Sequence, residues 1–179
     1  MTDHKTSPSQ KADQKLSFLI KMYYTQLKER STNRMRWERA NHSWTGTVLV
    51  HELFLRLEGV DVPSEEDEFM RFAVHKFEQI LVDHARKRGA KKRRYDLRQE
   101  LLSEPMVNWD HTVWIMYSEI LEKLAELNPR RAEIFQMRRY GFENNEVAKI
   151  LKLSPQTTSS QYRLALVWLK NELDLNSEE

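Results

Sequence analysis

The sequence predicts an all-α protein made of two small helical domains joined by a basic linker. Its 179 residues include only 4 Gly and 5 Pro, whereas Leu, Glu, Lys, Arg and Gln, which favour helix over sheet, are frequent. Apolar residues recur at spacings of three and four, as they do on one face of a helix. Hydrophobic residues make up 40% of the chain, which is enough for two small cores.

The first domain is expected over residues 15–94 and should contain three helices. The first helix should run from Lys15 to about Arg39. The second, Thr47–Leu57, is so densely apolar that we expect it to be buried on most sides. An acidic loop with Gly and Pro at Gly59–Asp67 should precede a third helix from Phe69 to about Arg88.

The second domain is expected over residues 111–175, after a linker at 95–110. It should open with an amphipathic helix around Trp114–Leu124. The pair Asn128-Pro129 is typical of a helix start, because Asn caps free N–H groups and Pro fits the first turn. That second helix should end at Gly141.

The end of the chain fits a helix-turn-helix. A short helix at Asn144–Leu151, a turn at Lys152-Leu153 and a final helix from Ser154-Pro155 to about Leu173 have its spacing. The side chains expected to face inward are Val147, Ala148, Leu151, Thr158, Tyr162 and Ala165. An ordinary helical hairpin fits the spacing about equally well, and Lys152 stands where many such turns carry Gly.

In a helix-turn-helix, the N-terminal residues of the second helix lead into the major groove of DNA. The candidates for DNA contact on that helix are Gln156, Thr157, Ser159, Ser160 and Gln161, with Arg163 near phosphate. This predicted face is almost uncharged.

Charge is segregated along the chain, although the formal net charge is only +2. Between Arg86 and Arg98, 8 of 13 residues are Lys or Arg, and between Glu58 and Glu68 there are six acids and no base. A basic run of this kind is often a solvated linker, but beside a helix-turn-helix it favours phosphate binding. The DNA-binding candidates in it are Arg86, Lys87, Arg88, Lys91, Lys92, Arg93 and Arg94.

No catalytic or metal-binding constellation is found in the sequence. The chain has no Cys, which excludes disulfides and thiolate metal sites. His51-Glu52 lacks the second His that a zinc peptidase helix carries four residues after the first, because that position is Leu55. Asp83-His84 has no accompanying nucleophile, oxyanion loop or phosphate cradle. We therefore expect neither an enzyme nor a cofactor-binding protein.

The sequence gives no sign of membrane insertion or secretion. No run approaches the roughly 20 apolar residues of a membrane span. Residues 1–14 should form a flexible polar tail without the apolar segment of a secretory signal. Together with the absence of Cys, this favours a cytoplasmic location.

Three segments, in order along the chain, carry a resemblance to a known family. They are WERANHSWTGTVLVHELFLRL (37–57), ILVDHARKRGAKKR (80–93) and LNPRRAEIFQMRRYGFENNEVAKILKLSPQTTSSQYRLALVWLKNEL (127–173). They resemble RNA polymerase sigma factors of the extracytoplasmic-function (ECF) type, most closely the branch with VHE, ILVDHAR and RLARAWL-like motifs. The resemblance covers roughly residues 16–173.

This resemblance implies a second and a fourth sigma domain that recruit core RNA polymerase to promoter DNA. The helix corresponding to Val48–Leu57 would dock on the coiled coil of the largest polymerase subunit. The minus-ten promoter element would be contacted by the helix corresponding to Phe77–Arg94. The minus-thirty-five element would be contacted by the helix corresponding to Pro155–Lys170. The implied polymerase contacts are His51, Glu52 and Arg56. We expect the free chain to be a monomer, with an anti-sigma factor as a candidate partner.

Several positions depart from the family pattern. Ser159 and Ser160 stand where relatives often carry Lys or Arg. Glu78 and Gln79 stand where close relatives tend to have two arginines, and Ser64–Glu68 is acidic where relatives have Arg and His. Fewer phosphate-facing cations weaken DNA binding. Two alternatives therefore stay open: a stand-alone helix-turn-helix regulator that dimerises through its N-terminal helices, and a degenerate sigma-like protein-interaction module.

Overall fold

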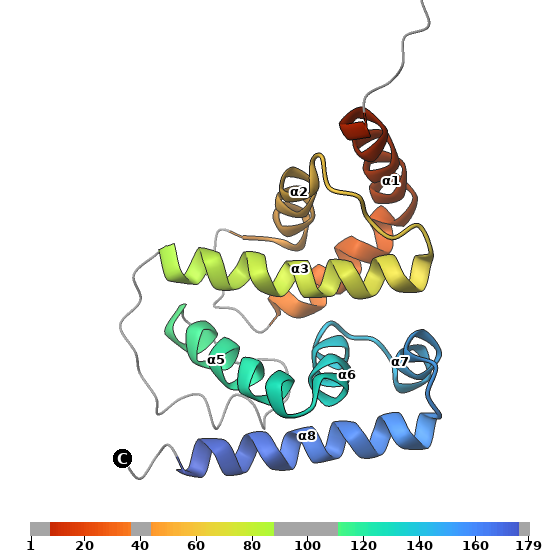
Figure 1. Ribbon diagram of the computed structural model, residues 1–179. Helices are drawn as coiled ribbons and strands as arrows, with labels where there is room; N and C mark the ends of the chain where they lie inside the picture. The colour runs from red at the N-terminus through yellow and green to blue at the C-terminus, as the bar shows by residue number, and fades with distance from the viewer. Residues whose placement is uncertain (1–7, 37–43, 88–110, 176–179) are drawn as a thin grey trace, which may run out of the picture.

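The computed structural model describes residues 8–36, 44–87 and 111–175. Every regular element in these ranges is an α-helix (Figure 1), which confirms the all-α prediction. The helices are α1 (Pro8–Met35), α2 (Gly46–Leu57), α3 (Glu66–Lys87), α5 (His111–Leu127), α6 (Pro129–Arg139), α7 (Asn144–Leu151) and α8 (Pro155–Leu175). Within the described residues, no helix is both long and apolar enough to span a lipid bilayer.

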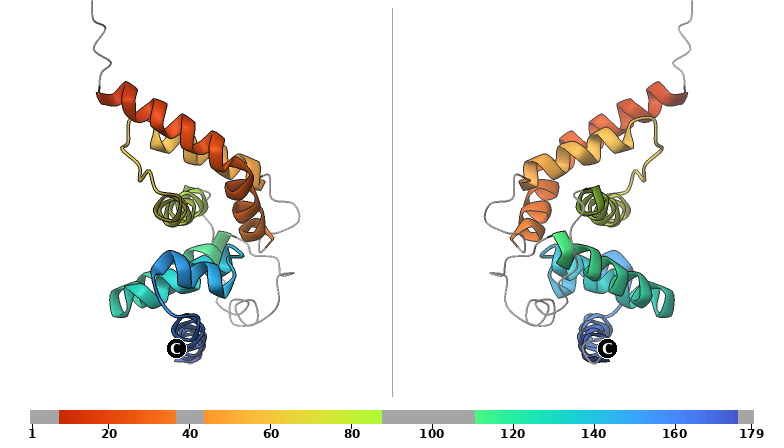
Figure 2. Two further views of the ribbon diagram at one scale, coloured as in Figure 1. Left: turned by 90° about the vertical axis from the view of Figure 1, so that its right-hand side faces the viewer. Right: turned by 90° about the vertical axis from the view of Figure 1, so that its left-hand side faces the viewer.

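The helices are stacked in layers with α3 in the middle. Helices α1 and α2 pack on one side of α3, and α5, α6 and α7 lie on the other (Figures 1 and 2). Helix α8 covers the outer side of the α5–α7 layer. We call residues 8–87 the N-terminal half and residues 111–175 the C-terminal half. Buried apolar side chains of the two halves form one continuous core, so the halves are packed together in this structure.

Helix α1 starts earlier in the chain than the sequence indicates. It begins at Pro8, a residue well suited to a first turn, so the second part of the predicted tail 1–14 is helical. The carboxylate of Asp13 accepts a hydrogen bond from the N–H of Gly59 at 2.6 Å. This contact holds the first turns of α1 against the loop after α2. At its other end, α1 stops at Met35, before the predicted end.

Helix α2 is buried on one side only, so the prediction of burial on most sides was wrong. Its buried residues are Gly46, Leu49, Val50, Leu53 and Leu57, whereas Leu55 is 46% exposed. The apolar residues nearly encircle the helix, but α1 and α3 together cover only one side of it. The uncovered side is therefore available to a partner.

The predicted caps of the C-terminal half are confirmed. The side-chain oxygen of Asn128 accepts a hydrogen bond from the N–H of Arg131 at 2.9 Å and starts α6. Ser154 Oγ accepts from the N–H of Thr157 at 3.0 Å and starts α8. Each cap satisfies a backbone donor that has no partner inside its helix.

The turn between α7 and α8 has the shape of a helix-turn-helix turn despite its lysine. Lys152 adopts a left-handed conformation with φ +55°, which glycine adopts with less strain. The N–H of Leu153 donates to the carbonyl of Ala148 at 2.8 Å, as in the usual glycine-ended helix terminus. Thr158 and Ala165 face inward and are fully buried, as predicted.

We expect Gly46→Ala to lower the free energy of unfolding by about 1–3 kcal/mol, because α1 and α2 have no room for an extra carbon there. A Cβ at Gly46 would lie 2.8 Å from the backbone nitrogen of Thr32 and 2.9 Å from Ser31 Oγ. Urea denaturation of Gly46→Ala and of Thr47→Ala measures this effect. Thr47, the next residue in the chain, is exposed, and Thr47→Ala is therefore the control. It should leave the free energy of unfolding unchanged or slightly raised. If the two variants were equally stable, α1 and α2 would not be closely packed at Gly46.

Candidate functional site

The first turns of α8 present an exposed polar face. Gln156, Thr157 and Ser160 are exposed and Ser159 is half-buried. Beneath them, Thr158 is fully buried and its hydroxyl donates to the carbonyl of Ser154 at 3.1 Å. The buried threonine fixes the rotation of the helix, so that its neighbours point outward. This is the orientation that a groove-reading helix requires.

Two of the predicted contact residues on α8 differ in their environment. Arg163 is exposed and lies about one turn beyond Ser159 and Ser160. Gln161 is half-buried, and its Oε1 accepts a hydrogen bond from Nε of Arg131 on α6 at 3.0 Å. Gln161 therefore helps to dock α8 on α6, and it is less available to a base edge than Gln156.

The basic run is described only in part. Arg86 and Lys87 end α3 and are exposed, and Nη2 of Arg86 lies 4.0 Å from a carboxylate oxygen of Glu122 on α5. The remaining predicted DNA contacts lie outside the described residues; they are Arg88, Lys91, Lys92, Arg93 and Arg94.

The predicted polymerase contacts lie on the uncovered side of α2. His51 and Arg56 are exposed, and Glu52 is half-buried. Leu55 lies beside them. The four residues occupy positions i, i+1, i+4 and i+5 of the helix, counted from His51, and these positions share one side of it. Nη1 of Arg56 donates to Asp83 of α3 at 2.6 Å, so this arginine also holds α2 against α3.

A buried polar group that sequence reasoning missed lies where the layers meet. Arg34 of α1 is fully buried and Glu78 of α3 is 5% exposed. Nε of Arg34 donates to Glu78 Oε1 at 2.8 Å. The same guanidinium lies 5.1 Å from the ring centroid of Tyr117 and 5.9 Å from that of Tyr140. Burial alone would lower the pKa of Arg34, but the charge of Glu78 outweighs this effect and raises it, so the arginine stays protonated.

Arg139 completes this group on the side of α6. Its guanidinium lies 5.8 Å from the Tyr117 ring centroid. Burial, and then the charge of Arg34, lower the pKa of Arg139 to about 10, so it is still protonated at neutral pH. Burial raises the pKa of both Tyr117 and Tyr140, and Glu78 adds to this, so both phenols keep their protons. We call Arg34, Glu78, Tyr117, Arg139 and Tyr140 the buried cluster.

In the sequence, Glu78 and Gln79 stand where close relatives tend to have two arginines that would face phosphate. The structure changes this interpretation. Glu78 belongs to the buried cluster, and only Gln79 is exposed, with its Nε2 3.0 Å from a ring nitrogen of His75. One sequence signal could have revealed this. Glu78 lies on the apolar stripe that includes Val74 and Val82, both of which are buried, and an acid on such a stripe needs an internal partner.

We expect Glu78→Gln to lower the free energy of unfolding by about 3–5 kcal/mol, because it leaves the buried charge of Arg34 without its counter-charge. Urea denaturation at neutral pH measures this loss. The same change at exposed Glu126 should shift stability by less than about 0.5 kcal/mol. If Glu78→Gln were as mild as Glu126→Gln, the ion pair would not be buried in solution.

Comparison with known proteins gives one match. The family model described as ECF sigma factor matches residues 7–175, which include every helix of both halves. No curated protein and no solved structure matches the chain. Sigma factors are non-catalytic proteins of transcription initiation that work with RNA polymerase on promoter DNA. The chain belongs to the ECF sigma factor family.

Proposed function

We propose that this sigma factor binds core RNA polymerase through α2 and promoter DNA through α3, the adjoining basic run and α8. The observation that carries the proposal is the match of one family model to the whole described chain, combined with exposed polar faces on α2 and α8. The N-terminal half would act as the second sigma domain and the C-terminal half as the fourth. Residues 95–110 would belong to the linker between them.

The exposed start of α8 supports its role as the reader of the upstream promoter element. Gln156 and Thr157 are exposed in its first turn, and glutamine side chains pair well with adenine edges in the major groove. Arg163 would contact phosphate. The low charge of this face means that α8 contributes selectivity more than affinity.

The uncovered side of α2 supports its role in docking on polymerase. It combines an exposed apolar side chain, Leu55, with His51 and Glu52. A mixed apolar and polar patch of this kind is typical of protein interfaces. Promoter affinity would then come from two weak DNA contacts on one chain that polymerase holds in place, because tethering raises the effective concentration of the second contact.

Co-purification with core polymerase, followed by transcription from a library of promoter sequences, tests the proposal. A sigma factor should be captured as a monomer and should yield transcripts from a defined set of promoters. Capture without promoter-specific transcripts would instead indicate a degenerate interaction module. A dimer that binds a palindromic site without polymerase would indicate a stand-alone regulator.

We expect the basic run to supply most of the electrostatic attraction to DNA. Changing Lys91, Lys92, Arg93 and Arg94 to Gln should flatten the slope of log affinity against log salt by about three to four units, since each phosphate that is no longer neutralised accounts for roughly 0.9. Fluorescence anisotropy with the polymerase complex and a labelled promoter duplex measures the slope. Neutralising Lys11, Lys21 and Lys28, which are exposed on α1, is the matched control. An equal effect per charge in both variants would mean that only net charge matters.

We expect Gln156→Ala to relax the preference for one base pair in the upstream element by about 1–3 kcal/mol, because alanine cannot make the bidentate hydrogen bonds to a base edge. Sequencing of transcripts from the promoter library reads this preference directly. Capture of polymerase should not change, since α2 is intact. The comparison variant is Lys170→Ala, which alters an exposed residue about four turns later on α8. If Gln156→Ala and the parent chain preferred the same promoters, Gln156 would not contact a base pair of the upstream element.

A further inference from the structure

The first turn of α8 extends beyond the core that holds the rest of this helix. Ala165 is fully buried, and the ring of Tyr162 stacks on that of Phe135 with centroids 5.9 Å apart. Thr158 is the first buried residue of the helix, and residues 155–157 before it are all exposed. The core therefore fixes α8 from its second turn onward, and the first turn needs another support.

Asn144, the first residue of α7, supplies that support. Its side-chain nitrogen Nδ2 donates to the carbonyl of Pro155 at 2.9 Å, and Asn144 itself is half-buried. In the part of the chain that the structure describes, this is the hydrogen bond that ties residues 155–157 to another helix. The Ser154 cap acts within the start of α8, so it does not fix the position of this turn on α7.

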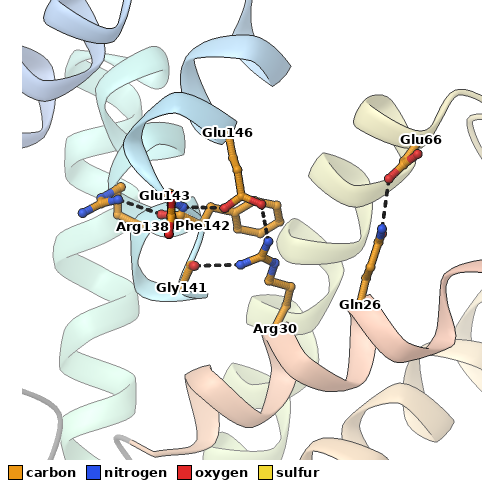
Figure 3. Close-up of polar contacts among 8 residues, drawn as sticks. All are labelled: Gln26, Arg30, Glu66, Arg138, Gly141, Phe142, Glu143 and Glu146. Atoms are coloured by element: carbon orange, nitrogen blue, oxygen red, sulfur yellow. Dashed lines mark hydrogen bonds and ion pairs between the residues drawn. The ribbon is translucent and has the colours of Figure 1, made fainter.

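The end of α7 from which Asn144 reaches is itself held in place. The N–H of Glu143 donates to Glu146 Oε2 at 2.6 Å and closes the first turn of α7 (Figure 3). Just before it, Arg138 Nη1 donates to the carbonyl of Phe142 at 2.8 Å. Both bonds lie within the C-terminal half. A side chain on a fixed support holds its partner within a narrow range of positions.

The turn between α7 and α8 does not fix the direction of α8 by itself. Lys152 adopts φ +55°, which is strained for a residue with a side chain, so other conformations of the turn would relieve this strain. The N–H of Leu153 donates to the carbonyl of Ala148 at 2.8 Å and ends α7. The bond between Asn144 and the Pro155 carbonyl lies beyond the turn and holds α8 in place despite the strain.

From these contacts we propose that Asn144 is a positioning residue for promoter recognition. It sets the direction of the first turn of α8, and so determines how strictly Gln156 discriminates between base pairs, without contacting DNA itself. The inference rests on the proposed function, in which Gln156 reads the upstream promoter element. Gln156 directly follows Pro155, so the bond acts one residue from the reading side chain.

Discrimination depends on the direction of this turn because two parallel hydrogen bonds to a base edge need a narrow range of positions. A first turn held by Asn144 presents Gln156 in that range before DNA arrives, so binding of the right base pair costs little entropy. A first turn without this bond must be ordered by the right base pair, and it can adapt to a wrong one. Loss of the bond therefore reduces the difference in affinity between the two.

Asn144→Ala removes the bond, and Asn145→Ala is the matched control. Asn145 is exposed at the next position of α7, and its substitution leaves the Pro155 carbonyl bonded. Transcription with core polymerase from the promoter library gives the ratio of transcripts from the preferred and the changed base pair. We expect Asn144→Ala to lower this ratio about two- to tenfold, as for the loss of one net hydrogen bond, and Asn145→Ala to leave it unchanged. An equal fall of all transcripts in Asn144→Ala would indicate a merely structural role and overturn the proposal.

Asn144→Asp separates selectivity from stability. A carboxylate has the shape of the amide but cannot donate to a carbonyl at neutral pH, so the transcript ratio should fall at least as far as in Asn144→Ala. An acid in the first turn of a helix interacts favourably with the helix dipole, so the free energy of unfolding in urea should stay close to that of the parent. Asn145→Asp adds the same charge and should keep the parent's ratio. A ratio that followed stability, and so stayed unchanged in Asn144→Asp, would overturn the proposal.

A double-mutant cycle tests whether Asn144 acts through Gln156. In a chain that carries Gln156→Ala the reading side chain is already absent, so Asn144→Ala should not lower the ratio at that base pair any further. A further fall of the same size would mean that Asn144 acts on DNA by another route, and the proposal would be wrong.

The parent chain distinguishes this inference from the proposed function. If the parent gave no promoter-specific transcripts, the proposed function would fail, and the role of Asn144 would fail with it. If the parent were selective and both Asn144 variants were equally selective, only the positioning role would fail.

Discussion

The ion pair between Arg34 and Glu78 is the constraint on which the arrangement of layers depends. Neither charge can be buried alone, because transfer of an unpaired ion out of water costs several kcal/mol. Each needs the other within hydrogen-bond distance, so α1 and α3 must cross where these residues stand, and the observed separation is 2.8 Å. The rings of Tyr117 and Tyr140 then cover the pair from the C-terminal half. One interaction thereby fixes the relation of α1, α3, α5 and α6.

The buried cluster lies inside a core that is otherwise apolar and that continues from one half into the other. Removing one partner of the ion pair costs more than removing one apolar contact, because the other charge is then left buried without its partner. Arg30 of α1 adds a second polar contact between the halves, since its Nη1 donates to the carbonyl of Gly141 at 2.7 Å.

Local sequence signals predicted the C-terminal half well, whereas contacts between residues far apart in the chain left few local signals. Asn128 and Ser154 indicate the starts of their helices because a cap acts within three residues. The spacing of a helix-turn-helix predicts that Thr158 faces inward, and its side chain is buried. Arg34 looks like an ordinary surface residue at the polar end of α1, since its partner stands 44 positions later. The early start of α1 at Pro8 also depends on a distant residue. Asp13 contacts Gly59 only after the fold has formed, so nothing near Pro8 in the sequence indicates this contact.

The first turns of α8 are exposed, but with Ser159 and Ser160 in place of cations they offer little attraction to phosphate. Under the proposed function, most of the electrostatic attraction to DNA would come from the basic run that begins at the end of α3. Polymerase would then hold both DNA contacts on one promoter, and this tethering would make the weak contact of α8 effective.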